Sequence, residues 1–361
     1  MKAQNKRAAD YGISFGIFKT GLNNAITDVP GVKVGHVTLT EGNSVNTGIT
    51  AILPHPGNLF QSKVPAAIYI GNGFGKLTGY SQVEELGNIE TPVILTNTLS
   101  VPVASDAVID YTLSFPENRG IMSVNPVVGE TNDGGLNDIQ NRIITKDHVL
   151  KAIAASDTGV VEEGNVGAGT GTVCFGFKGG IGTSSRILPK SKGGYIIGVL
   201  VQTNFGGILQ IDGVPVGREL GKHKFSRITD EYKEDGSCMV VIMTDAPLDS
   251  RNLKRMAARA MAGIARTGGM TSNSSGDFAI AVSTAENLRI PYNAKSMYQE
   301  VKLLRNEEMD LLFEAVIEAT EEAIINSLFA AKTVTGRYNL KIEALPLEKT
   351  IEIMRKYNRI K

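Results

Sequence analysis

The chain reads Thr267-Gly268-Gly269-Met270-Thr271-Ser272-Asn273-Ser274-Ser275-Gly276-Asp277 and continues directly as Phe278-Ala279-Ile280-Ala281-Val282-Ser283. The paired glycines end a helical pattern, the hydroxyl-rich residues form a polar loop, and the apolar run predicts a strand. Because that run is apolar without alternation, we expect both faces of the strand to be buried. Ser275 therefore stands at the mouth of a buried strand, where a sheet would hold its hydroxyl group rigidly.

The rest of the chain mixes short apolar runs with longer segments of helical periodicity. Gly, Pro, Asn or Asp residues bound three further predicted strands, at 93–96, 195–202 and 239–244. Apolar stripes with a 3.6-residue period predict helices at 250–266, 306–331 and 347–358. These elements show no regular βαβ alternation, so we expect an α/β fold of sheets covered by helix layers, in one domain over 1–361.

Composition excludes several classes of function. Lysine plus arginine equals aspartate plus glutamate at 37 each, which gives no field to attract nucleic acid or an anionic membrane. No run of 18 apolar residues and no apolar signal segment near the start is present, so we expect a cytoplasmic protein. Cys174 and Cys238 lie in apolar runs and are expected to be buried as small hydrophobic residues.

The 40 glycines are clustered, as in 71–75 and 167–171, which suits either tight sheet packing or loops around a substrate. Neither cluster is a nucleotide-binding motif. Leu77 follows Lys76 where a P-loop needs Ser or Thr, and Thr172 replaces the last glycine of a dinucleotide fingerprint. The four histidines have no metal-ligand spacing, so we expect no metal and no cofactor. A histidine-based triad has no support in the sequence, although spacing alone does not exclude one.

Ser275 can do chemistry without a histidine. Its hydroxyl could attack the carbonyl of the preceding residue and form an ester that water then cleaves. The freed α-amine, with a pKa of about 7.7 to 8.0 in model peptides, can act as the general base for the hydroxyl beside it. The alternative interpretation of the segment is an ordinary polar turn.

An ordered set of motifs resembles the DmpA-type self-processing aminopeptidases, the family of L-aminopeptidase/D-amidase-esterases and β-aminopeptidases. The likeness spans nearly the whole chain, and its motifs lie at 26–36, 130–134, 165–171, 201–206, 267–277 and 318–323. It implies a layered αββα sandwich that resembles N-terminal-nucleophile hydrolases but has a different topology. It also implies cleavage into chains 1–274 and 275–361, which stay together and form homo-oligomers.

The resemblance assigns roles to individual residues. Ser275 matches the nucleophile and new N-terminus, and Asn204 matches an asparagine whose amide binds the developing oxyanion. Thr320 and Glu322 match a hydroxyl-x-Glu pair on a helix that orients the nucleophile and its amine. Glu130 matches an acidic residue that lines the substrate pocket and holds the substrate's ammonium group.

Each assignment has a structural alternative. Asn204 could be a turn residue at a strand end, and Glu130 a solvated surface carboxylate. Thr320 shares the buried stripe of its helix, where its hydroxyl could bond to the helix backbone. Glu322 lies about 200° further round that helix, so the two side chains cannot both face one small pocket.

Two residues depart from the family pattern. Ser274 stands where the family commonly has glycine, which tolerates a strained peptide better, and it is itself an outside candidate for the nucleophile. Gly135 stands where a family tyrosine serves as second oxyanion donor. The leading hypothesis is an N-terminal-serine hydrolase that releases N-terminal residues from small peptides, amides or esters. The alternatives are an acyltransferase on the same fold, and an uncleaved non-catalytic scaffold.

Overall fold

The strand predicted after the serine-rich loop is β12 (Gly276–Ser283), and it lies inside a large sheet of the computed structural model, which describes residues 6–226 and 236–361. β12 pairs in parallel with β11 (Ser237–Thr244) on one edge and antiparallel with β3 (Ser62–Gly73) on the other. α5 (Ser250–Arg266) connects β11 to β12, as a parallel pair requires. The four predicted strands are confirmed, with ends that differ by at most two residues.

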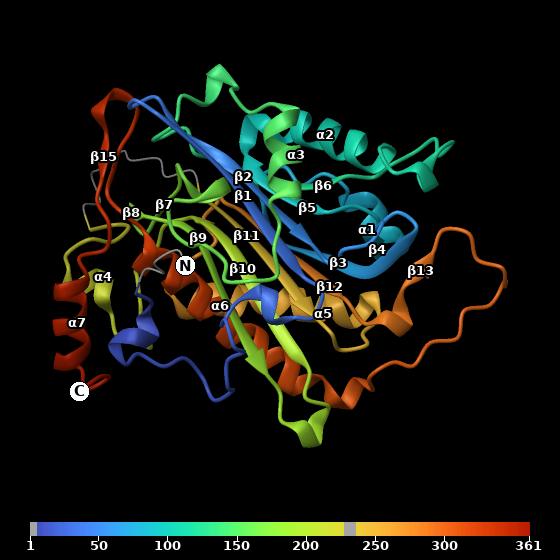
Figure 1. Cartoon of the computed structure of the whole chain (residues 1–361). Coiled ribbons are helices and arrows are strands. Elements are labelled where there is room, and N and C mark those ends of the chain that lie inside the picture. The colour runs from blue at the N-terminus through green and yellow to red at the C-terminus, as the bar shows by residue number, and fades with distance from the viewer. Residues whose placement is uncertain (1–5, 227–235) are drawn as a thin grey trace.

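Two sheets stack face to face between outer helix layers (Figure 1). In the described residues, the larger sheet has the strand order β13-β3-β12-β11-β10-β9, with β4 also paired to β3; the further bounds are β4 Asn88–Ile89, β9 Gly180–Ile187, β10 Ile196–Asn204 and β13 Ile290–Pro291. The smaller sheet has the order β1-β2-β5-β6; its bounds are β1 Lys33–Glu41, β2 Val45–Leu53, β5 Val93–Asn97 and β6 Val127–Thr131. Two short ribbons pair β7 (Val173–Cys174) with β8 (Phe177–Lys178) and β14 (Val334–Thr335) with β15 (Lys341–Ile342).

The helices cover the outer faces of both sheets. α5 and α6 (Met309–Ala330) lie on the larger sheet, and α2 (Val101–Leu113) and α3 (Lys146–Ala154) lie on the smaller one (Figure 1). The other helices are α1 (Tyr80–Leu86), α4 (Val216–Glu219) and α7 (Leu347–Lys356). The predicted helix at 306–331 starts three residues later as α-helix, because 306–308 form a 3₁₀ turn. None of the helices in the described ranges has the length and apolar character that a membrane span requires.

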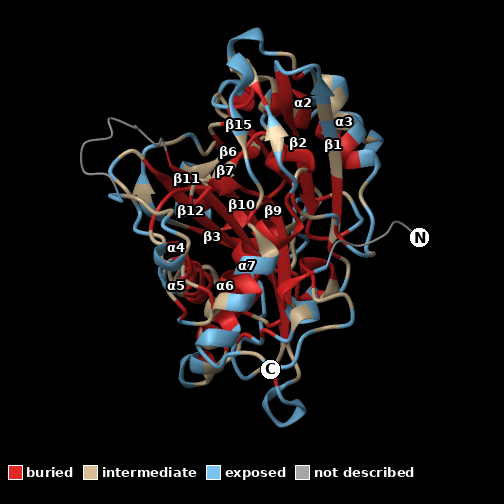
Figure 2. Cartoon of the chain, turned by 90° about the vertical axis from the view of Figure 1, so that its left-hand side faces the viewer, coloured by how far each residue is buried: buried red, intermediate tan, exposed pale blue. Residues whose placement is uncertain are grey.

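The residues of the inner strands and of the helix faces turned toward them are buried (red in Figure 2). Within the described residues, their hydrophobic side chains form three clusters. Along β12, Ala279 and Ala281 face the α5–α6 layer, while Phe278, Ile280 and Val282 face the second sheet. Every residue of β12 is buried, which confirms the expectation drawn from its continuous apolar run. Both cysteines are likewise buried, as predicted.

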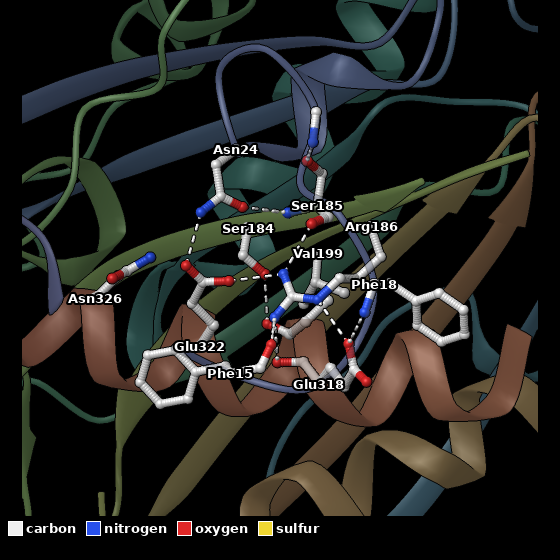
Figure 3. Close-up of polar contacts among 12 residues, drawn as sticks. Phe15, Phe18, Asn24, Ser184, Ser185, Arg186, Val199, Glu318, Glu322 and Asn326 are labelled. Carbon is white, nitrogen blue, oxygen red and sulfur yellow. Dashed lines mark hydrogen bonds and ion pairs between the residues drawn. The ribbon is translucent and has the colours of Figure 1, made fainter. Parts of the chain in front are cut away.

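An ion cluster inside the protein ties α6 to the edge strand β9 (Figure 3). The fully buried guanidinium of Arg186 bonds Glu318 at 2.9 Å and Glu322 at 2.6 Å. The second carboxylate oxygens accept hydrogen bonds from Ile17 N, at 2.7 Å to Glu318, and from Asn24 Nδ2, at 2.7 Å to Glu322. The cluster therefore joins three segments that are distant in sequence: the N-terminal loop, β9 and α6.

The Arg186→Met variant should lower the free energy of unfolding by about 3 to 5 kcal/mol, because it leaves two buried carboxylates without their cation. Urea denaturation measures this loss. Lys192→Met is the control, since Lys192 pairs with Glu308 at 2.9 Å where both side chains are about half exposed, and its loss should cost less than about 1 kcal/mol. Equal losses in the two variants would show that the buried cluster contributes no more than a surface pair.

A buried lysine at the end of β8 bonds to the glycine-rich loop at 167–171. Lys178 has no exposed surface, and its Nζ donates to the carbonyl oxygens of Gly169 and Gly179 at 2.9 Å each. Burial lowers the pKa of Lys178 to about 7, although the nearby Cys174 and Asp133 oppose that shift.

Lys178 should make the protein's stability depend on alkaline pH. Between about pH 7 and 10.5 the unfolded chain binds this proton and the folded protein does not, so stability rises with pH across that window. The added slope approaches about 1.4 kcal/mol per pH unit. Urea unfolding at pH 7, 8 and 9 should show a steeper rise for the native chain than for Lys178→Met. Parallel curves would contradict the lowered pKa.

Candidate active site

Ser275 lies immediately before β12, and only 1% of its surface is exposed. Its Oγ donates a hydrogen bond to Asp277 Oδ1 at 2.8 Å. Its backbone N–H donates to the carbonyl oxygen of Ser272 at 2.8 Å, which closes a turn in the polar loop. The predicted position at the mouth of a buried strand is confirmed, and the hydroxyl is held in one direction by a carboxylate.

Asp277 is a site residue that the sequence analysis did not assign. It lies two residues after Ser275, so strand alternation puts both side chains on one face. Asp277 is 1% exposed, and within the described residues its Oδ2 has no hydrogen-bond partner. Burial raises the pKa of Asp277 to about 6, against the opposing hydrogen bond from Ser275. The i, i+2 spacing at the strand start was the signal that could have found it.

Asn72 at the end of β3 fixes the loop that precedes the strand. Its Nδ2 donates to the carbonyl oxygens of Ser272, at 3.0 Å, and of Ser275. Phe74 N also donates to the Ser275 carbonyl, at 3.2 Å. The chain on both sides of the 274–275 peptide is therefore held by β3. The neighbouring Gly71 serves packing, because a Cβ there would lie 2.2 Å from Met261 Sδ.

Asn204 is the last residue of β10 and reaches the same end of the sheet. Its register partner on β11 is Ser237, which in turn pairs with Gly276 on β12. Neighbouring strands lie about 4.8 Å apart, so the Cα atoms of Asn204 and Gly276 are about 10 Å apart. The Asn204 amide oxygen accepts a hydrogen bond from Val173 N at 2.9 Å, which orients the side chain.

Glu130 comes from the other sheet, on β6, and only 3% of it is exposed, so it is not a solvated surface carboxylate. It accepts hydrogen bonds from Lys76 N at 2.9 Å and from the Thr98 hydroxyl. Burial raises its pKa, although both bonds oppose the shift. A Cβ placed on Gly75 would lie 3.2 Å from Glu130 Oε1 and 3.4 Å from Gly276 Cα. Glu130 and the start of β12 therefore flank the same glycine.

The structure does not bring Glu322 to Ser275. Glu322 bonds Arg186 (Figure 3). In the strand register, Arg186 lies opposite Ile197, Ile197 opposite Thr244, and Thr244 opposite Ser283. That row meets the far end of β12, about 23 Å along the strand from Gly276 at 3.3 Å per residue.

Thr320 points in a different direction from Glu322, as their angular separation on the helix predicts. It faces α5, where a Cβ on Gly263 would lie 2.6 Å from Thr320 Cβ. Its Oγ1 has no hydrogen-bond partner within the described part of the chain. Neither Thr320 nor Glu322 shares a hydrogen bond or ion pair with Ser275. Asn204 and Glu130, by contrast, lie at the end of the sandwich where β12 begins.

Three further observations concern the surroundings of these residues. A cavity of about 1430 Å³ lies at the opposite end of β12, lined by residues that include His55, Asp245, Thr284 and Arg289, and none of the predicted site residues lines it. At Gly135, a Cβ would meet no heavy atom within 4 Å, so there is room where the family has an aromatic side chain. Within 6–226 and 236–361, no cluster of three or more His, Cys, Asp or Glu side chains could hold a metal ion.

Comparisons with known proteins agree with this geometry. The model of peptidase family S58 matches residues 24–342. The beta-peptidyl aminopeptidase BapA of Sphingosinicella microcystinivorans is 42% identical over 99% of this chain and 94% of its own length. The PH0078 protein of Pyrococcus horikoshii OT3 superposes with a TM-score of 0.91 at 48% identity, over 98% of this chain and all of its own.

A third relative identifies the fold. The L-aminopeptidase D-Ala-esterase/amidase of Ochrobactrum anthropi superposes with a TM-score of 0.90 at 37% identity, over 98% of this chain and 99% of its own. Its structure is described as a prototype for the serine aminopeptidases and a new variant among the Ntn hydrolase fold. The predicted layered fold and family resemblance are confirmed, and the chain belongs to peptidase family S58.

Proposed function

We propose that this protein is a self-processing aminopeptidase and amidase whose nucleophile is Ser275. The chain would be cut between Ser274 and Ser275, and the pieces 1–274 and 275–361 would remain one catalytic unit. The observation that carries the proposal is the placement of Ser275 at the mouth of β12, with its hydroxyl bonded to a carboxylate. The names of the S58 relatives, a beta-peptidyl aminopeptidase and an L-aminopeptidase D-Ala-esterase/amidase, support the same reaction class.

In the processed protein the Ser275 amine would take the hydroxyl proton as Oγ attacks the acyl carbon of the substrate. The departing amine would take that proton, and water would then hydrolyse the ester on Ser275. Asn204 Nδ2 would donate to the oxyanion from the neighbouring strand end, and an oxyanion donor of this kind contributes about 2.7 to 4 kcal/mol.

Glu130 would bind the ammonium group of the substrate. Its carboxylate is buried near Gly276, and burial raises its pKa, so a cation beside it would offset the cost of its charge. This gives the site a preference for small peptides, amides and esters with a free amine. Thr320 and Glu322 share no hydrogen bond or ion pair with Ser275, so the proposal gives them no part in the reaction. By resemblance to the family, the protein would be a homo-oligomer of processed pairs.

Ser275→Ala should give only the full-length 38.6 kDa chain and no turnover of amino-acid amides, because the attacking oxygen is gone. Intact mass under denaturing conditions and release of p-nitroaniline from aminoacyl p-nitroanilides measure the two effects. Ser274→Ala is the matched control and should be cut and active. If Ser274→Ala is the uncut and inactive variant instead, the nucleophile is Ser274.

Glu130→Gln should lower kcat/KM by roughly 10- to 100-fold for substrates with a free amine, since a hydrogen bond to a charged group is worth about 1.5 to 3 kcal/mol. The same substrate with an acetylated amine should lose no activity relative to its own wild-type rate. Self-cleavage of this variant should be normal. A loss of equal size on both substrates would show that Glu130 does not bind the ammonium group.

A further inference from the structure

The first cut needs a different base from the later reaction, an argument that rests on the proposed function. In the uncut chain the nitrogen of Ser275 is part of the 274–275 peptide bond. Its lone pair is delocalised into the carbonyl, so it cannot accept the hydroxyl proton near neutral pH. The amine that would serve the mature enzyme is a product of the cut. Another group must therefore receive the proton in the precursor.

Asp277 is the group in contact with that proton. Its Oδ1 accepts the Ser275 hydroxyl hydrogen bond at 2.8 Å, and both residues are 1% exposed. Asp277 Oδ2 has no hydrogen-bond partner in the described part of the chain. A purely structural carboxylate in such a place would be expected to use both oxygens.

The surroundings keep the carboxylate a usable base. On β11 its register neighbour is Cys238, whose pKa is raised well above the usual value by burial, so the thiol is uncharged at neutral pH. On β3 its neighbour is the uncharged Asn72, and Met261 of α5 packs against adjacent Gly71. Burial raises the pKa of Asp277 to about 6, which leaves it ionised at neutral pH and more basic than an exposed aspartate.

We propose that Asp277 is the catalytic base of self-cleavage, a role separate from the amine's role in the processed enzyme. Asp277 Oδ1 takes the proton from Ser275 Oγ as Oγ bonds to the carbonyl carbon of Ser274. The C–N bond to Ser275 then breaks, and the nitrogen takes the proton back from Asp277. This frees the Ser275 amine and leaves Ser274 as an ester on Oγ. Water then hydrolyses the ester to the Ser274 carboxylate and the Ser275 hydroxyl, and the amine takes up the proton that the new acid loses.

Asn72 is a positioning residue for the same step, because it fixes the chain around the bond that is cut. Its amide holds the carbonyl oxygens of Ser272 and Ser275, which lie on either side of the scissile peptide. With both sides fixed, the Ser274 carbonyl and the Ser275 hydroxyl keep their relative place while the bond forms.

The test is the rate at which newly made full-length chain is cut, followed by cell-free synthesis, quenching and denaturing intact mass. Asp277→Asn should slow the cut about 100-fold or more, the usual contribution of a general base. The asparagine oxygen can still accept the Ser275 hydrogen bond but cannot take its proton, so a structural role would survive this change. Asp277→Glu should restore part of the rate. Asp245→Asn, at a partly buried aspartate of the opposite sheet end, is the control and should be cut normally.

The pH profile separates catalysis from folding. The native chain should be cut faster as pH rises to about 6 and at a constant rate above it, because the base must be ionised. Asp277→Asn should lack that bend. If Asp277→Asn does not fold, Asp277→Glu alone decides, and a folded but uncut Asp277→Glu overturns the proposal. Normal cutting of Asp277→Asn also overturns it while leaving Ser275 as nucleophile. A native chain that is never cut refutes the proposed function itself.

Discussion

The central position of β12 is the constraint on which the site depends. The strand is hydrogen-bonded to β3 and β11 along its two edges and packed against a helix layer and a second sheet on its two faces. Its eight residues are all buried, so its register cannot slip without moving every side chain to the wrong face. Ser275 and Asp277 take their orientation from this register. The hydroxyl is thus positioned by the whole sandwich and not by its own loop.

Burial also sets the chemistry at this end of the molecule. The pKa values of Asp133 and Asp277 are raised to about 6, and that of Glu130 is raised as well, in each case mainly by burial. Isolated buried carboxylates cost free energy, and a protein that keeps several of them near one strand end gives up stability for reactivity. Arg186 shows the opposite solution. There two buried carboxylates pair with one cation and accept hydrogen bonds from neighbouring amide groups. Their charge is compensated, and the cluster links the N-terminal loop, β9 and α6.

Local pattern predicted the elements that dominate the fold. The continuous apolar run of β12 and the periodic stripe of α5 were recognisable because each element's own residues specify its burial. The start of α6 was less clear, since its first residues form a 3₁₀ turn. Glu130 was assigned through resemblance alone, because glutamate is usually exposed and only the fold buries it.

What sequence could not supply is contact between distant segments. The partners of Glu322 are Arg186 and Asn24, which lie 136 and 298 residues away, so nothing local shows that its charge is taken up at the far end of the sheet. Asn72 was part of a glycine-rich run with no assigned role, and its bonds cross 200 residues and more. Asp277 is the exception, since alternation along a strand would have been enough to place it beside Ser275, although the sequence analysis did not assign it.

The pairing of β12 on both edges also determines how the protein would behave after a cut just before this strand. The peptide 275–361 would begin with a strand inserted between two strands of the other piece, and would continue through α6, which packs on β9 and β10. Dilution could not separate such pieces, because release would require opening both ladders and exposing the core on either side. The two polypeptides would share one cooperative unfolding transition, and neither would have a folded existence alone.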